Sequence, residues 1–115
     1  MKMNNSVCSI GEVTKVSDKY EVRDDYSLNK LILSSTSLKP GCATNGHKHM
    51  SQDEVFLFYG YGEIHLRYPD EDQGEIDEVI QVEPGSVVSV PVGVFHRVHN
   101  IAEDNILFYV RVMSK

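Results

Sequence analysis

Residues 41–54 contain the side chains best suited to chemistry: two histidines one residue apart, followed within five positions by a carboxylate. Side chains alternate between the faces of an extended strand, so His47 and His49 would point the same way, with Cα atoms roughly 7 Å apart. Two imidazole nitrogens at this spacing can converge on one ion about 2 Å from each. A carboxylate arriving after a short turn can supply a third ligand. The stretch predicts most of a metal site, and the rest of the chain must supply a fourth ligand and the walls.

Short strands must position these residues. Runs of β-branched and aromatic residues recur at short intervals between Gly, Pro, Asn and Asp signals, and no long stretch has helical periodicity. The expected strand segments are residues 7–16, 20–23, 30–38, 55–59, 63–68, 78–82, 86–90 and 106–112. This pattern predicts an all-β sandwich or barrel, closed to limit pairing at sheet edges.

Glycine and proline mark the turns between these segments. Pro-Gly pairs at 40–41 and 84–85 each introduce a histidine-bearing segment, so we expect the two halves to build one shared site. The two glycines within 60–62 predict a tight hairpin between the apolar runs on either side. The acidic cluster at 70–75 lacks the spacing of a calcium loop, and we expect it to be a solvated hairpin loop.

The composition limits the class of protein. The chain has 115 residues, 41% of them hydrophobic, which predicts one domain with a single modest core. Its net charge of −6 argues against a nucleic-acid partner. No apolar run approaches the ~20 residues that cross a bilayer, and the N-terminus lacks the apolar segment of a secretory signal. Because Cys8 and Cys42 are too few for a disulfide framework, we expect a cytoplasmic protein with reduced thiols.

A second segment, residues 85–100, follows the pattern G-x5-P-x-G-x2-H-x3-N. Its fixed positions are filled by Gly85, Pro91, Gly93, His96 and Asn100. This pattern resembles the second motif of the cupin superfamily. Residues 41–62 resemble the first cupin motif, in which Gly41, the two histidines and Glu54 fill the fixed positions.

The resemblance implies a fold and a metal site inside a barrel. It implies one cupin domain over residues 1–115, with the cupin double-stranded β-helix, or jelly-roll barrel. It also implies one divalent transition metal, Fe, Mn, Zn, Ni or Co, since such ions accept mixed imidazole and carboxylate donors. The implied ligands are His47, His49, Glu54 and His96. Four protein ligands would leave two positions of an octahedral ion open to a small molecule.

Two neighbouring carboxylates compete for the ligand position. Asp53 lies at a spacing from His49 that the cupin motif also allows. Glu54 is favoured because its side chain reaches further and because Glu54-Val55-Phe56 resembles the usual family sequence.

Two shorter segments, Thr44-x-Gly46-His47-x-His49 and His96-Arg97-x-x-Asn100, resemble metal-binding segments of the archaeal cupin-type phosphoglucose isomerases. This resemblance implies that a small polar molecule, such as a sugar or sugar phosphate, binds in the barrel and is isomerised. Thr44 would lie near the sugar phosphate, and Glu54 would move the proton as the catalytic group. Two alternatives stay open: an Fe(II)-dependent dioxygenase, and a non-enzymatic module that binds small molecules through the metal.

Other polar residues depend on which face of a strand is inside. His65 and Arg67 would contact substrate if their face of strand 63–68 lines the barrel, and would be ordinary surface residues if it faces water. His99 has the opposite parity to His96 and is expected to point outward. A sheet edge formed by residues 7–16 could pair with the same sheet of a second copy, which predicts a homodimer.

Overall fold

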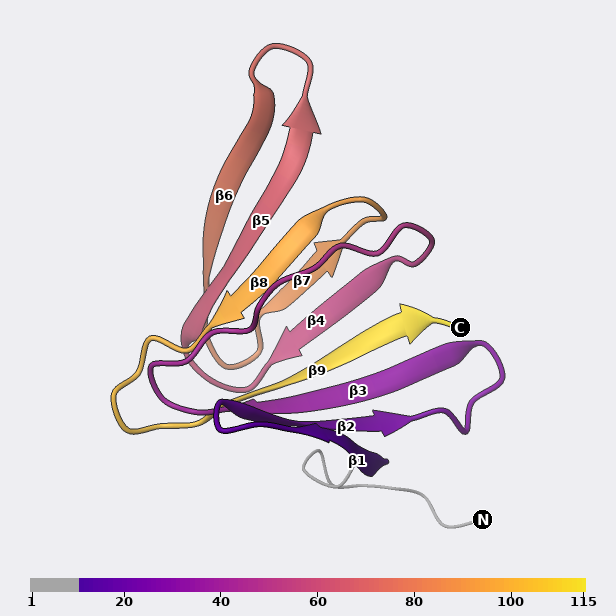
Figure 1. Ribbon diagram of the computed structural model, residues 1–115, viewed down its shortest axis with the longest axis vertical. Coiled ribbons are helices and arrows are strands. Elements are labelled where there is room, and N and C mark those ends of the chain that lie inside the picture. Colours follow the sequence, from indigo (N-terminus) through magenta and orange to yellow (C-terminus); the bar gives the residue numbers. More distant parts are fainter. Residues whose placement is uncertain (1–10) are drawn as a thin grey trace.

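The computed structural model describes residues 11–115, and all regular secondary structure in that range is β-strand. Figure 1 shows the nine strands in chain order. They are β1 (Glu12–Val16), β2 (Tyr20–Asp25), β3 (Leu31–Leu38), β4 (Glu54–Phe58), β5 (Gly62–Asp70), β6 (Gly74–Val82), β7 (Val87–Val90), β8 (Phe95–His99) and β9 (Leu107–Ser114). The all-β prediction is confirmed. In the described range, no helix is long and apolar enough to cross a membrane.

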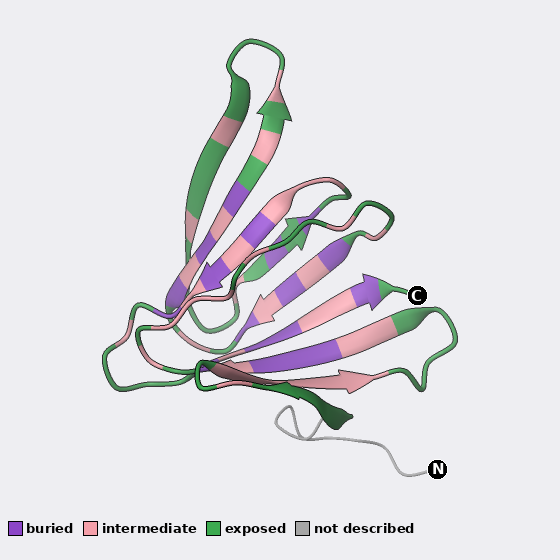
Figure 2. Ribbon diagram, viewed as in Figure 1, coloured by how far each residue is buried: buried purple, intermediate pink, exposed green. Residues whose placement is uncertain are grey.

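The strands form two antiparallel sheets. The larger sheet has the order β1-β2-β3-β9-β4-β7, and the smaller has the order β6-β5-β8. Both sheets contribute to one buried apolar cluster, in which Phe56 and Phe58 of β4 are grouped with Ile64 of β5 and Val98 of β8. Buried residues alternate with more exposed ones along β4, β5 and β8 (Figure 2), so each strand turns one face to this interior.

The connection through residues 59–61 joins the two sheets, and the hairpin predicted there is wrong. β4 pairs with β7 and β9, whereas β5 pairs with β6 and β8. Gly62 allows the crossing because its backbone packs closely against neighbours: a Cβ there would lie 2.9 Å from the carbonyl oxygen of His99 and 2.6 Å from Leu107 Cδ2. Gly62 is thus required for close packing between the sheets and not for a two-strand turn.

The acidic cluster forms the end of the β5–β6 hairpin, as predicted. The two strands stay paired up to Asp70 and Gly74, and the turn lies between them. Asp70 Oδ2 accepts hydrogen bonds from the backbone N–H groups of Asp72 and Gln73, which stabilises the turn. Of the strand expected at residues 7–16, the structure shows 12–16 as β1, and residues 7–10 lie outside the described range. β8 was not among the expected strands, because its residues had been assigned only to the second motif.

Candidate metal centre

Backbone pairing brings the two histidine-bearing segments together. The His47 N–H donates to the carbonyl of His96 at 3.1 Å, and the His96 N–H donates back to the carbonyl of His47 at 2.9 Å. Gly46 permits this approach, because its φ is +83° and a Cβ would lie 2.4 Å from Cζ of Phe95. The Gly93 N–H donates to the carbonyl of His49 at 2.8 Å and fixes the far end of the loop. The loop is therefore held as an extra edge against β8.

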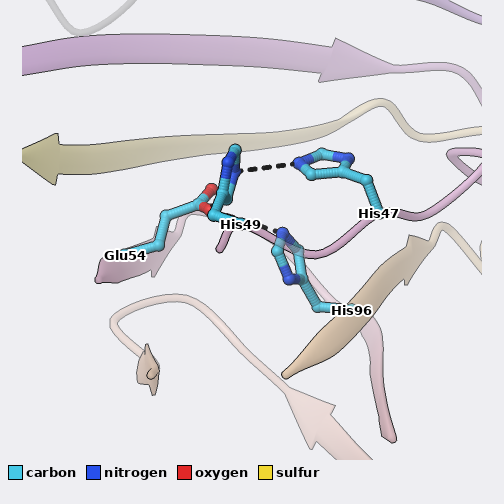
Figure 3. Close-up of side chains that lie close together, drawn as sticks. All are labelled: His47, His49, Glu54 and His96. Atoms are coloured by element: carbon cyan, nitrogen blue, oxygen red, sulfur yellow. Dashed lines mark hydrogen bonds and ion pairs between the residues drawn. The ribbon is translucent and has the colours of Figure 1, made fainter. Parts of the chain in front are cut away.

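Three imidazoles and one carboxylate converge at this junction (Figure 3). His47 Nε2 lies 3.1 Å from His49 Nε2, and His49 Nε2 lies 2.7 Å from Glu54 Oε1. His96 Nε2 lies 3.4 Å from the same carboxylate oxygen. One donor atom from each residue lies within 4.8 Å of the others. This spread is close to that of donors which share one ion at about 2.0–2.2 Å.

Two of these donor atoms are buried without a hydrogen-bond partner among the described residues, namely Glu54 Oε1 and His96 Nε2. The contacts of Glu54 Oε1 with His49 and His96 have ion-pair distances but not hydrogen-bond geometry, whereas the two ring nitrogens of His47 and His49 are within hydrogen-bond range of each other. A carbonyl oxygen only accepts, so the contact of His96 Nδ1 with the Val94 carbonyl at 3.1 Å places the ring proton on Nδ1. In the neutral ring Nε2 then carries a free lone pair that points to the cluster. Two buried ligand atoms without hydrogen-bond partners, one of them on a ring oriented by the Val94 carbonyl, fit a bound metal ion.

Arg111 of β9 holds the carboxylate from the other side, and the motifs gave no signal for it. Its Nη1 donates to Glu54 Oε2 at 3.1 Å, and its Nη2 donates to Ser34 Oγ at 2.9 Å. Glu54 and Arg111 lie far apart in sequence, so only the pairing of β4 with β9 reveals the contact. A weak signal existed: Arg111 is the one charged residue in the apolar run that ends the chain's last strand.

The surroundings shift the pKa values of two cluster members in the direction that metal binding requires. Burial alone would raise the pKa of the Glu54 carboxyl, but the adjacent His96 imidazole and the charge of Arg111 lower it below its ordinary value. The pKa of His47 is lowered from 6.5 to about 4, first by burial and then by the positive charge that its neighbours His96 and His49 would carry. A carboxylate and a neutral imidazole are the ligand forms, and both are favoured near neutral pH.

The structure places Glu54, not Asp53, in the cluster. Glu54 is the first residue of β4, and its side chain is 1% exposed. Asp53 is exposed, and its Oδ1 accepts a hydrogen bond from the backbone N–H of Val92 at 3.1 Å. The neighbouring carboxylate thus anchors the loop that carries the second motif.

A cavity of about 600 Å³ opens beside the cluster and lies against the larger sheet. His47 and His96 form part of its wall, and so does Thr44. Thr44 Oγ1 accepts a hydrogen bond from the Val98 N–H at 3.0 Å, which leaves the hydroxyl proton free to donate. The other lining residues are Thr14, Lys15, Tyr20, Val22, Asp24, Thr36, Asn45, Gly46, Phe56, Val98, Tyr109 and Arg111. Hydroxyl, charged and apolar groups therefore line a space large enough for a small molecule.

The structure does not bring His65 and Arg67 to this cavity. Leu66 of β5 is paired with His96 of β8, and directly opposed residues share a face, so the odd-numbered neighbours point to the other side. Arg67 is half exposed and forms an ion pair with Asp77 at 2.7 Å. The condition for their contact with substrate, an inward-facing parity, is not met.

Comparison with known proteins defines the fold class. No protein-family model matches the sequence, and no curated protein matches it. Among solved structures, the chain is similar to KdgF from Halomonas sp., with 16% identity and a TM-score of 0.68 over 90% of this chain and 84% of that one. It is similar to a mutant of Bacillus subtilis oxalate decarboxylase OxdC, with 20% identity and a TM-score of 0.73 over 88% of this chain and 27% of that one.

A third similar structure is CapF, solved with the inhibitor 3-isopropenyl-tropolone, at 24% identity and a TM-score of 0.70 over 88% of this chain and 30% of that one. The chain therefore spans less than a third of the length of OxdC and of CapF. These neighbours are cupin β-barrels, and the chain has the cupin fold.

Proposed function

We propose that this chain is a metal-dependent cupin that binds one divalent transition metal through His47, His49, Glu54 and His96. The observation that carries the proposal is the convergence of these four donors beside a cavity that His47 and His96 line. Two of the donor atoms are buried and have no hydrogen-bond partner among the described residues. A bound Fe, Mn, Co, Ni or Zn ion would satisfy the orphaned atoms and would polarise oxygen atoms of a molecule in the cavity.

We propose further that the molecule is a small polyol, such as a sugar or a sugar phosphate, and that the reaction is of the isomerase type. The lining supports a hydroxylated ligand, since Thr36, Thr44 and Tyr20 offer hydroxyl groups and Asp24 and Lys15 offer an acceptor and a donor. The charged lining residues Lys15, Asp24 and Arg111 offer groups of either sign to a polar ligand. The sequence resemblance to sugar-phosphate isomerases is the second support.

The chain's own residues have separate tasks in this proposal. Glu54 stays ionised because its pKa is lowered, and only the ionised carboxylate can accept a proton from a neighbouring carbon or hydroxyl group. Arg111 holds the carboxylate in one orientation through Oε2 and leaves Oε1 toward the histidines. Thr44, with a free hydroxyl proton, is placed to donate to a ligand oxygen.

The experiment combines metal reconstitution with a substrate panel. The purified protein is stripped with a chelator, reloaded separately with each of the five metals, and offered aldoses, ketoses and their phosphates. We expect aldose–ketose exchange that requires metal and that is lost in His96→Ala. Oxygen consumption by the Fe(II) form with a phenolic or thiol substrate, and no exchange of sugars, would replace the isomerase proposal with the dioxygenase alternative.

Tropolone provides a further probe, because its adjacent oxygens can chelate one ion and CapF was solved with a tropolone inhibitor. Tropolone binding that requires metal, with no turnover of any sugar and no oxygen uptake, would indicate a binding module. Unchanged tropolone binding after His96→Ala would contradict the assignment of the metal to this cluster.

A further inference from the structure

A second group of metal-binding side chains lies on the outer face of the smaller sheet. Glu63 and His65 are two residues apart on β5, so they share a face, and His99 of β8 is paired directly with Glu63. The residue between Glu63 and His65, Ile64, is fully buried in the core. Buried positions alternate with less buried ones along this part of β5 (Figure 2). The group is therefore on the opposite side of the sheet from His96 and outside the centre described above.

The geometry points to a second metal site formed by Glu63, His65 and His99; we propose that it binds a divalent transition metal. One donor atom from each residue lies within 4.8 Å of the others. His99 Nδ1 lies 3.9 Å from Glu63 Oε1, too far for a hydrogen bond and short enough for two ligands of one ion. The imidazole rings of His65 and His99 are 6.3 Å apart at 76°, so their edges can face a common point.

The donor set defines the class of ion. Two imidazoles and one carboxylate suit Zn(II), Co(II) or Ni(II), with water or an external ligand in the remaining positions. All three side chains are half buried, so they have already lost part of their hydration before an ion binds. Because the three residues lie on two paired strands, their Cα atoms are already fixed, and binding an ion costs little conformational entropy.

An unpartnered atom gives independent support. His65 Nε2 is buried and has no hydrogen-bond partner within the described part of the chain. On the neighbouring strands, His65 is paired with Arg97 of β8 and with Val79 of β6. Neither neighbour accepts a hydrogen bond from a ring nitrogen, since a guanidinium only donates and valine has no polar side-chain atom. A metal ion would satisfy this nitrogen.

The surroundings also predict the strength and the accessibility of the site. Arg97 lies on the same face, and its charge opposes a cation, so we expect weaker binding than at the inner centre. A depression of about 290 Å³, lined in part by His65, Arg97 and Phe95, reaches His65 from solvent, so an ion can approach the group from that side.

The histidines allow the two sites to be counted separately. The chain has five histidines, three in the inner cluster and two in the outer group. Equilibrium dialysis against Zn²⁺, followed by elemental analysis, gives the number of ions bound per chain. We expect two for the unchanged protein, one for His47→Ala/His49→Ala, one for His65→Ala/His99→Ala, and none when all four changes are combined.

A result of no zinc in His47→Ala/His49→Ala would overturn the proposal, and so would zinc in that protein that survives the added His65→Ala/His99→Ala changes. If the inner variant does not fold, as judged by circular dichroism, the comparison of the unchanged protein with His65→Ala/His99→Ala decides. An equal number of ions in those two proteins would exclude the outer site. Failure of the inner site alone would appear as a single ion that is lost with the outer histidines.

Single substitutions test the details of the site. Glu63→Gln removes one ligand and should weaken the outer site at least about ten-fold in a zinc titration of His47→Ala/His49→Ala protein. Glu71→Gln is the matched control, because Glu71 is exposed in the β5–β6 turn and remote from the group. Arg97→Gln should tighten binding by removal of the opposing charge. Equal zinc affinity of the Glu63→Gln and Glu71→Gln proteins would show that the carboxylate is not a ligand.

Discussion

At the scale of single residues, one cation sets the properties of the inner centre. Arg111 donates to Glu54 Oε2 and to Ser34 Oγ, and Ser34 and Glu54 are both buried. The guanidinium compensates the buried carboxylate charge and fixes its rotamer, so that Oε1 faces the histidines. Arg111 is thus a positioning residue that acts on the metal through its ligand.

Replacement of Arg111 by Met should weaken metal binding by about 10–100-fold, the usual effect of losing a group that orients a ligand. The loss should be largest at mildly acidic pH, because removal of the charge raises the pKa of Glu54 and protonation then competes with the metal. Calorimetric titration with Co²⁺ at two pH values measures both effects. Arg23→Met is the control, since Arg23 pairs with Glu21 on β2 at 3.1 Å, outside the centre. Equal affinities of the two variants would contradict this role.

His47 should make the metal-free protein sensitive to acid. Its pKa is about 4 in the folded state and near 6.5 when unfolded, so the unfolded state takes up the proton first as the pH falls. The contribution of His47 to stability is therefore complete above pH 6.5 and is lost as the pH falls toward 4. Urea unfolding in the presence of a chelator at pH 7 and pH 5 measures this difference.

We expect His47→Ala to show a smaller loss of unfolding free energy between pH 7 and pH 5 than the unchanged protein. His99→Ala is the matched control, because His99 lies on the face of the smaller sheet opposite to the inner centre. A pH dependence that His47→Ala leaves unchanged would show that His47 is not held neutral in the fold.

At the scale of elements, the crossing of the chain from the larger to the smaller sheet after β4 determines which strands are neighbours. The crossing after β4 sends β5 to the smaller sheet, and β9 then takes the place beside β4. This arrangement puts Arg111 beside Phe56 and next to Glu54, and it puts β8 beside β5. A hairpin at the same position would have placed β5 beside β4, where β7 or β9 now lies.

Gly62 should be the most sensitive position of this crossing. In Gly62→Ala the added Cβ would meet the His99 carbonyl oxygen at 2.9 Å, and backbone cannot yield as a side chain does. We expect a loss of about 1–3 kcal/mol in unfolding free energy, as is usual for overpacking. Gly60→Ala is the comparison, because its Cβ would meet only Leu107 Cδ1 closely, at 3.1 Å. Urea unfolding of both variants tests this, and equal losses would argue against a backbone clash at Gly62.

The sequence predicted the parts of this architecture that depend on local pattern. Alternation predicted that His47 and His49 point the same way; both reach the same cluster, although residues 47–49 form a loop with an isolated bridge and not a strand. Turn residues marked the β5–β6 hairpin. The crossing at residues 59–61 was missed because glycines that permit close packing look the same as glycines that form a turn. Arg111 was missed because its role depends on a pairing between distant strands. The inner or outer orientation of His65 was left open, since alternation gives two faces and not which of them is buried.

At the scale of the whole molecule, the outer edge of β1 has no partner strand within residues 11–115. β1 is the end strand of that sheet, and its five residues are all exposed. Val13 and Val16 on it are 44% and 66% exposed. Exposed apolar residues on an edge strand favour pairing with another strand, so a second copy of the chain is the expected partner.

We expect light scattering to give twice the chain mass for the unchanged protein and the chain mass for Val16→Lys, since a charged edge resists pairing. Tyr61→Lys is a matched control, because Tyr61 is also 66% exposed but lies in the crossing between the sheets. A monomeric unchanged protein, or a Val16→Lys protein that stays dimeric, would refute the prediction.

Elemental analysis of the His65→Ala/His99→Ala protein tests most directly whether His47, His49, Glu54 and His96 bind one ion. This protein retains the inner donors and lacks the outer histidines, so every ion counted is assigned to the inner centre. After dialysis against Zn²⁺ it should contain one ion per chain, and the further change of His96 to Ala should remove it. No bound zinc in this protein, or one ion that persists without His96, would contradict the account.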